Sequence, residues 1–67
     1  MDIYERLEKE FKDYPIGFTE GDGGLIEVIP KDYSIYRGRI GYWEDSIEDL
    51  IKATHRYLER ENIVKIS

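Results

Sequence analysis

Apolar residues at helical spacing near the end of the chain constrain the fold more than any other feature of the sequence. They fall on one face of a helix, at positions Ile47, Leu50, Ile51, Thr54 and Leu58. Asp45 and Ser46 are both suitable N-caps, and Asp45 with Glu48 has the spacing of a capping box. Asn62 is a suitable stop. A helix with one apolar face needs another apolar surface to cover it.

The start of the chain repeats this pattern over fewer residues. Ile3, Leu7 and Phe11 recur every four residues and form one apolar stripe. Asp2 can cap the helix, with Glu5 three residues later as in a capping box. Because a proline disfavours helical geometry in the residue before it, Pro15 sets a limit to this segment. The spacing predicts a helix over about residues 2–13.

Between these helices the pattern changes to that of β-strands. Ile16–Glu20 alternates apolar with small or polar residues, and Leu25–Ile29 is apolar and β-branched apart from Glu27. The glycine-rich segment 21–24 is typical of a tight turn, because glycine adopts positive φ freely. Pro30 ends the second run. The two runs therefore predict a β-hairpin.

A third strand is predicted over Tyr33–Tyr42, where aromatic residues and isoleucines interleave with arginines and glycines. Gly38 and Gly41 indicate a bulge, a bend or the close approach of a helix. The β-branched run Ile63–Ile66 is compatible with a short C-terminal edge strand, with Lys65 protecting its edge.

The order of elements predicts a single α+β domain over residues 1–67. Sixty-seven residues leave room for one core only. A three-stranded antiparallel sheet with both helices on one face satisfies the order α-β-β-β-α. By alternation, Tyr36, Ile40 and Tyr42 share the face expected under the helices, and Arg37 and Arg39 share the other. That other face also exposes Leu25, Glu27, Ile29, Tyr33 and Ile35, and a one-residue register shift inverts the assignment.

The composition favours a binding protein over an enzyme. The chain has no cysteine, and its one histidine, His55, has no catalytic triad around it. No spacing of histidines and carboxylates suits a metal, and no glycine-rich phosphate loop is present, so neither a cofactor nor a metal is expected. No apolar run suits a membrane span or a signal-peptide core, which favours a cytoplasmic location.

The charge pattern points to a basic protein partner. Fifteen acids against ten bases give a net charge of −5. Four acids surround the start of the second helix beside two aromatic residues, and two more form a second acidic patch. These candidate binding residues are Tyr42, Trp43, Glu44, Asp45, Glu48 and Asp49, then Asp22 and Glu27. Helix capping and solubility also explain acids in such places. As a binding surface, they would steer a basic partner and bury the aromatic rings.

Two alternatives remain open at this stage. The open sheet face or an edge strand at Ile63–Ile66 would build a homodimer and make the chain a self-association module. A nucleic-acid site would use Tyr33, Arg37 and Arg39, since aromatic rings stack on bases and arginines contact phosphates. Two arginines release few counterions, and the net charge opposes nucleic acid.

Several short motifs resemble those of HicB-type antitoxins over about residues 14–58. The opening hairpin of that family is similar to Tyr14-Pro15, Phe18, Glu20, Asp22-Gly23-Gly24, Glu27-Val28 and Pro30. Its later glycine, capped helix start and helix are similar to Gly41, Asp45-Ser46, Glu48 and Ile51. The segment from Pro30 to Asp45 is longer than in the family, and the family's Pro-Asp-Leu-Pro-Gly-Cys stretch is absent.

The resemblance implies a β-β-β-α core related to double-stranded-RNA-binding folds. It also implies a protein that neutralises a small basic toxin. Antitoxins, nuclease inhibitors and anti-defence proteins of phage or mobile-element type all fit a small acidic protein that covers a basic surface. The added first helix gives the order of the double-stranded-RNA-binding domain itself. That domain has basic residues at the start of its second helix, where this chain has Glu44, Asp45, Glu48 and Asp49. An acidic inhibitor of a basic protein is therefore the expected function.

Overall fold

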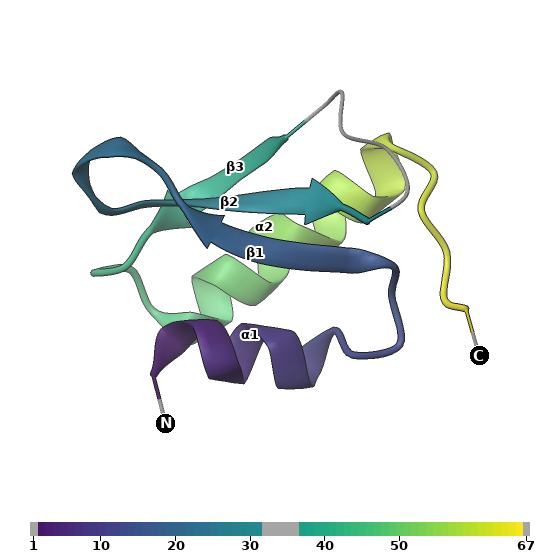
Figure 1. The fold of residues 1–67 in the computed structure, drawn as a ribbon, viewed down its shortest axis with the longest axis horizontal. Coiled ribbons are helices and arrows are strands. Elements are labelled where there is room, and N and C mark those ends of the chain that lie inside the picture. The colour runs from purple at the N-terminus through teal and green to yellow at the C-terminus, as the bar shows by residue number, and fades with distance from the viewer. Residues whose placement is uncertain (1, 32–36, 67) are drawn as a thin grey trace.

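The computed structural model describes residues 2–31 and 37–66, and these form an α+β domain of order α-β-β-β-α (Figure 1). The elements are α1 (Ile3–Glu10), β1 (Ile16–Glu20), the short 3-10 turn η1 (Asp22–Gly24), β2 (Leu25–Pro30), β3 (Gly38–Tyr42) and α2 (Ile47–Arg60). The strands form one antiparallel sheet in the order β1-β2-β3. The predicted fold class is confirmed. Neither described helix has the length and apolar character that crossing a bilayer requires.

Both helices cover the same face of the sheet. Helix α1 packs along β1 and α2 packs along β3, and the two helices also contact one another. The core between these layers is made of Leu7, Phe11, Ile16, Ile26, Val28, Ile40, Leu50, Tyr57 and Leu58. Thr54 is buried among them, and its hydroxyl donates a hydrogen bond to the Leu50 carbonyl at 2.7 Å. The stripes that predicted the two helices are therefore the surfaces that close the core.

A bulge in β3 changes which side chains lie on the open face of the sheet. Ile26 pairs with Gly41 and Glu27 pairs with Arg39, so Ile40 is an extra residue in β3. Beyond the bulge Tyr42 pairs with Leu25 and lies on the open face. The expectation that Tyr42 shares the face of Ile40 is therefore wrong, because simple alternation does not hold across a bulge. Ile40 itself is buried as expected.

The two glycines of β3 permit a close approach of α2. A Cβ on Gly38 would overlap the ring of Tyr57. A Cβ on Gly41, whose φ is +149°, would lie 2.8 Å from Leu50 Cδ2. The bulge and the helix contact that these glycines indicated are both present.

The first helix is shorter than its sequence pattern. The prediction of residues 2–13 is corrected to Ile3–Glu10, with Asp2 as N-cap through a 2.9 Å hydrogen bond from the Glu5 amide. Phe11 leaves helical geometry with φ −111° and ψ 27°, and its ring is buried in the core. The residues that follow form a turn, in which the Tyr14 amide donates to the Phe11 carbonyl at 3.0 Å.

The end of α2 agrees with the stop predicted at Asn62. Asn62 has a left-handed backbone with φ 57°. Its amide donates to Glu59 at 3.2 Å, and the Ile63 amide donates to Leu58 at 2.9 Å. This pair of hydrogen bonds is a Schellman motif, which satisfies the last carbonyls of the helix.

The other expected strand positions have mixed outcomes. Residues 63–66 form no strand, and the edge strand compatible with their sequence is absent. They run past the connection between α1 and β1, where the Ile66 amide donates to the Asp13 carbonyl at 2.9 Å. The third strand begins at Gly38. The part predicted over residues 33–36, which includes Tyr33, Ile35 and Tyr36, lies outside the described residues.

The close contact between α2 and β3 predicts a strong effect of one added methyl group. Replacing Gly38→Ala should lower the free energy of unfolding by about 1–3 kcal/mol, because the new Cβ overlaps the buried Tyr57 ring. Gly17→Ala is the matched control in β1, since its Cβ would have no atom within 4 Å. Urea unfolding monitored by circular dichroism measures both changes. Equal stability of the two variants would contradict this account of the contact.

Candidate functional site

Three segments that are distant in the sequence meet at one end of the molecule. The β1–β2 hairpin loop, the β3–α2 connection and the start of α1 lie together at the left of the view (Figure 1). We define this hairpin end by residues 2–5, 19–24 and 40–51. These ranges contain two, two and four acids respectively, and no lysine or arginine. The fold thus gathers negative charge that the sequence distributes over three places.

The connection from β3 to α2 is closed by two hydrogen bonds between the same two residues. The Asp45 amide donates to the Tyr42 carbonyl at 2.9 Å, and the Tyr42 amide donates to Asp45 Oδ2 at 2.8 Å. Helix α2 is capped instead by Ser46, whose Oγ accepts from the Asp49 amide at 3.2 Å. Asp45 therefore fixes the turn, and the capping box predicted for Asp45 with Glu48 is corrected to a cap by Ser46.

Trp43 is held on one side and open to solvent on the other. Its amide donates to the Gly24 carbonyl at 3.0 Å, and its indole lies so close to Gly24 that any Cβ there would overlap it. Trp43 is nevertheless 60% exposed, and Tyr42 is 49% exposed. A fixed aromatic residue with a free surface is a common centre of a protein interface, because little side-chain entropy is lost on binding.

The structure brings together most of the residues predicted for partner binding. The six from the β3–α2 connection and the start of α2 are all exposed at the hairpin end, namely Tyr42, Trp43, Glu44, Asp45, Glu48 and Asp49. Asp22 is also exposed there, on the hairpin loop. Glu27 differs from these, because it lies on the open sheet face opposite Arg39 and only 15% of its side chain is exposed.

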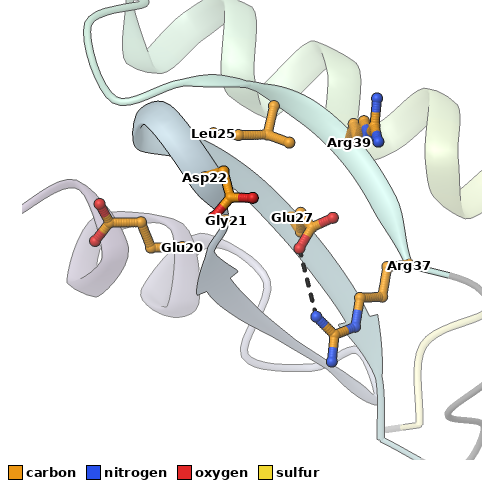
Figure 2. A pocket seen from close by; sticks show the side chains of 7 residues that line it. All are labelled: Glu20, Gly21, Asp22, Leu25, Glu27, Arg37 and Arg39. Atoms are coloured by element: carbon orange, nitrogen blue, oxygen red, sulfur yellow. Dashed lines mark ion pairs between the residues drawn. The ribbon is translucent and has the colours of Figure 1, made fainter.

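The open face of the sheet contains a hollow with charges of both signs. Its lining is Glu20, Gly21, Asp22, Leu25, Glu27, Arg37 and Arg39 (Figure 2). Arg37 Nη1 lies 3.6 Å from Glu27 Oε1. The Arg37 side chain is 59% exposed, and ion pairs that are open to solvent on one side contribute about 0–1 kcal/mol. Asp22 and Glu27 thus line one hollow, but the arginines reduce its negative charge.

The same pair bears on the nucleic-acid alternative. Arg37 and Arg39 are exposed on the open face, but Arg37 is paired with Glu27 and Glu27 lies opposite Arg39. Tyr33, the aromatic residue of that alternative, lies outside the described residues. Acids therefore accompany both arginines, and this is unfavourable for contact with phosphates.

A second hollow lies between the start of α1, the end of β1 and the turn after β3. It is lined by Asp2, Ile3, Tyr4, Glu20 and Trp43. Figure 2 shows the Glu20 side chain directed away from Glu27, toward the side of α1. From the sequence, Asp2, Tyr4 and Glu20 were not selected as candidate binding residues. Asp2 was explained by its role as a helix cap, and Tyr4 and Glu20 were assigned to a helix and a strand with no further role. Only tertiary structure places them beside Trp43.

The hydroxyl of Tyr4 shows the electrostatics of this second hollow. It is buried and has no hydrogen-bond partner within residues 2–31 and 37–66. Burial, and then the negative charges of Glu20 and Asp2, raise the pKa of Tyr4 above its ordinary value of 10.0. The carboxylates therefore act on the phenol through space, and the hollow is a region of negative potential.

The potential metal ligands of the described residues are dispersed over the fold. The described part of the chain contains no group of three or more His, Cys, Asp and Glu residues that could hold a metal ion. His55 is exposed on α2, with its ring 4.9 Å from the ring of Phe11. This contact is one of packing.

Comparisons with protein-family models, curated proteins and solved structures found no match. The order α-β-β-β-α and the three-stranded antiparallel sheet, which the resemblance to HicB-type antitoxins and double-stranded-RNA-binding folds implied, are present. No family match supports either identity.

The unpartnered hydroxyl of Tyr4 predicts that its removal stabilises the fold. Tyr4→Phe should raise the free energy of unfolding at pH 7 by about 1 kcal/mol, because a buried hydroxyl without a partner is costly. Tyr42→Phe, on an exposed ring, should leave it unchanged. Urea unfolding at pH 7 measures both variants, and destabilisation by Tyr4→Phe would show that the hydroxyl has a stabilising partner.

The same variant predicts a change at alkaline pH. Since the pKa of Tyr4 is higher in the folded than in the unfolded chain, the unfolded state loses this proton first. The free energy of unfolding is therefore independent of this proton well below pH about 10, and it falls as the pH rises toward the folded pKa of Tyr4. Tyr4→Phe should therefore lose less stability than the wild type between pH 9 and 11. If the free energy of unfolding of the wild type and of Tyr4→Phe changed equally with pH over this range, the raised pKa would be contradicted.

Proposed function

We propose that this protein is an acidic binding domain whose hairpin end covers a basic surface on another protein. The observation that carries the proposal is the position of Tyr42 and Trp43. Both rings are exposed at an end of the fold where acids from three segments gather. Aromatic residues are typical of interface centres. Acidic residues around them favour a partner of opposite charge.

Binding would proceed through two physical effects. The acids of the hairpin end attract a basic surface from a distance, which accelerates encounter at low ionic strength. Contact then removes Tyr42 and Trp43 from water, and burial of large aromatic side chains supplies most of the affinity of many interfaces. Because Asp45 and Gly24 already fix the turn and the indole, little ordering is required on binding.

An inhibitor is the class of protein that this mode of action fits best. Covering a basic surface blocks whatever that surface binds, and it requires no catalytic group, metal or cofactor. The resemblance to HicB-type antitoxins, which neutralise a small basic toxin, points in the same direction. The acids Glu44, Glu48 and Asp49 occupy the helix start where the related RNA-binding domain has basic residues.

The acids around the start of α2 provide the direct test. The probe is an N-acetylated octalysine amide, followed by the fluorescence of Trp43, the one tryptophan of the chain. The triple variant Glu44→Gln, Glu48→Gln, Asp49→Asn keeps the turn residue Asp45 and should bind about tenfold more weakly at low salt, since each exposed pair contributes about 0.2–1 kcal/mol. Its affinity should also depend less on salt concentration.

A charge-matched triple variant makes this test specific. Glu8→Gln, Glu10→Gln and Glu59→Gln remove the same number of charges from exposed positions outside the hairpin end. This variant should bind the peptide within about twofold of the wild type, because screening weakens distant charges. If the two triple variants lost the same affinity for the peptide, net charge alone would account for the attraction, and the proposal would fail.

Self-association through the open sheet face is a second candidate, favoured by the charge arrangement on that face. Leu25 and Ile29 are half-buried there, with Arg37 immediately before β3, near the Val28 end of the pairing with β2, and Asp22 before the other end of β2. A two-fold axis would bring the arginine of one copy near the acid of its partner. Light scattering across a concentration series at low and high salt decides this. A constant monomer mass excludes the dimer, and a dimer in both salts supports it.

A further inference from the structure

The hollow beside Trp43 combines aromatic surface with unpaired negative charge. We call it the aromatic–acid hollow and define it by its lining residues, Asp2, Ile3, Tyr4, Glu20 and Trp43. Three separate segments contribute to it, so it is a product of the tertiary fold. It lies inside the hairpin end, next to the acids proposed to attract a partner.

The carboxylates of this hollow have free capacity to accept hydrogen bonds. Asp2 uses Oδ1 to accept from the Glu5 amide at 2.9 Å, and its second oxygen remains. Glu20 is exposed at the last position of β1. Neither residue has a lysine or arginine within ion-pair distance among the described residues, where the ion pairs are Arg37–Glu27 and Arg60–Glu61. The two acids therefore form a negative site that has no ion pair within the described residues.

The aromatic residues make this site suited to an organic cation. Trp43 offers a largely exposed indole that is fixed against Gly24, and the Tyr4 ring forms part of the wall. The electron-rich face of an aromatic ring attracts ammonium and guanidinium groups, and tryptophan does so most strongly. Ile3 can contact the aliphatic part of a long side chain. An anion would be repelled by Asp2 and Glu20, and a purely apolar group would leave both carboxylates desolvated.

We infer that the aromatic–acid hollow receives the cationic end of one lysine or arginine side chain from the basic partner, between Glu20 and the indole of Trp43. This inference rests on the proposed function and adds a specific anchor point to it. The acids of α2 then act mainly in attraction from a distance. Glu20 and Trp43 act in the contact itself, so removing either weakens the complex more than removing one acid of α2.

Titration with a hexaarginine amide at low salt tests the inference, with hexacitrulline amide as the uncharged probe of similar shape. The backbone amides and the Trp43 indole N–H are followed by two-dimensional NMR. Glu20→Gln should weaken hexaarginine binding about three- to fivefold, as expected for one exposed charge pair coupled to an aromatic contact. Glu48→Gln is the matched control with the same loss of charge at the hairpin end, and should weaken binding only about twofold, as expected for one of the three α2 acids.

Trp43→Leu provides a second variant that keeps the charge and removes the aromatic face. It should weaken binding by a similar factor, measured through the Glu20 and Gly24 amides, while the rest of the spectrum shows an intact fold. Equal effects of Glu20→Gln and Glu48→Gln, with binding retained in Trp43→Leu, would overturn the inference and leave the proposed function standing. No binding of hexaarginine by the wild type, or equal binding of hexacitrulline, would overturn both.

Discussion

The close approach of α2 to Gly41 is the constraint on which the candidate site depends. Leu50 and Asp45 lie against the Cα of Gly41, whose φ of +149° marks the bulge in β3. The bulge turns Tyr42 onto the open face and directs the chain into the turn that Asp45 closes. The same turn places Trp43 against Gly24 of the hairpin loop. Gly41 and Gly24 thus allow the β3–α2 connection and the hairpin loop to lie in contact. The exposed rings of Tyr42 and Trp43 are held in place as a consequence.

Charge and packing cooperate at this end of the molecule. Acids at the beginning of a helix are favoured by its dipole, so Glu48 and Asp49 stabilise α2 whatever else they do. Asp2 and Asp45 likewise serve local structure through their hydrogen bonds. The fold therefore accumulates negative charge at the hairpin end at little cost to stability. Glu20 is distinct, because its side chain makes no hydrogen bond within residues 2–31 and 37–66, and this makes it the most informative acid to change.

The sequence predicted the fold well and the site only in part. Helical periodicity, caps and glycine turns are local signals, so α1, the hairpin and α2 follow from them, with errors of a few residues at the end of α1. The face predicted for Tyr42 was wrong, because the glycines indicated a bulge without fixing its position, and alternation was applied straight through Ile40. Six of the candidate binding residues could be proposed from the sequence because they lie in one short stretch, namely Tyr42, Trp43, Glu44, Asp45, Glu48 and Asp49. Asp2, Tyr4 and Glu20 were missed, because only the packing of α1 against β1 brings them to Trp43.

The most direct test of the central claim is a map of where a basic ligand contacts the folded protein. Backbone amide shifts of the ¹⁵N-labelled chain, recorded during titration with N-acetylated octalysine amide, give that map residue by residue. The account predicts that the largest changes fall in residues 2–5, 19–24 and 42–49, with the Trp43 indole N–H among them. Changes spread evenly over all acidic positions, or centred on the distant acids Glu8, Glu10 and Glu59, would contradict it.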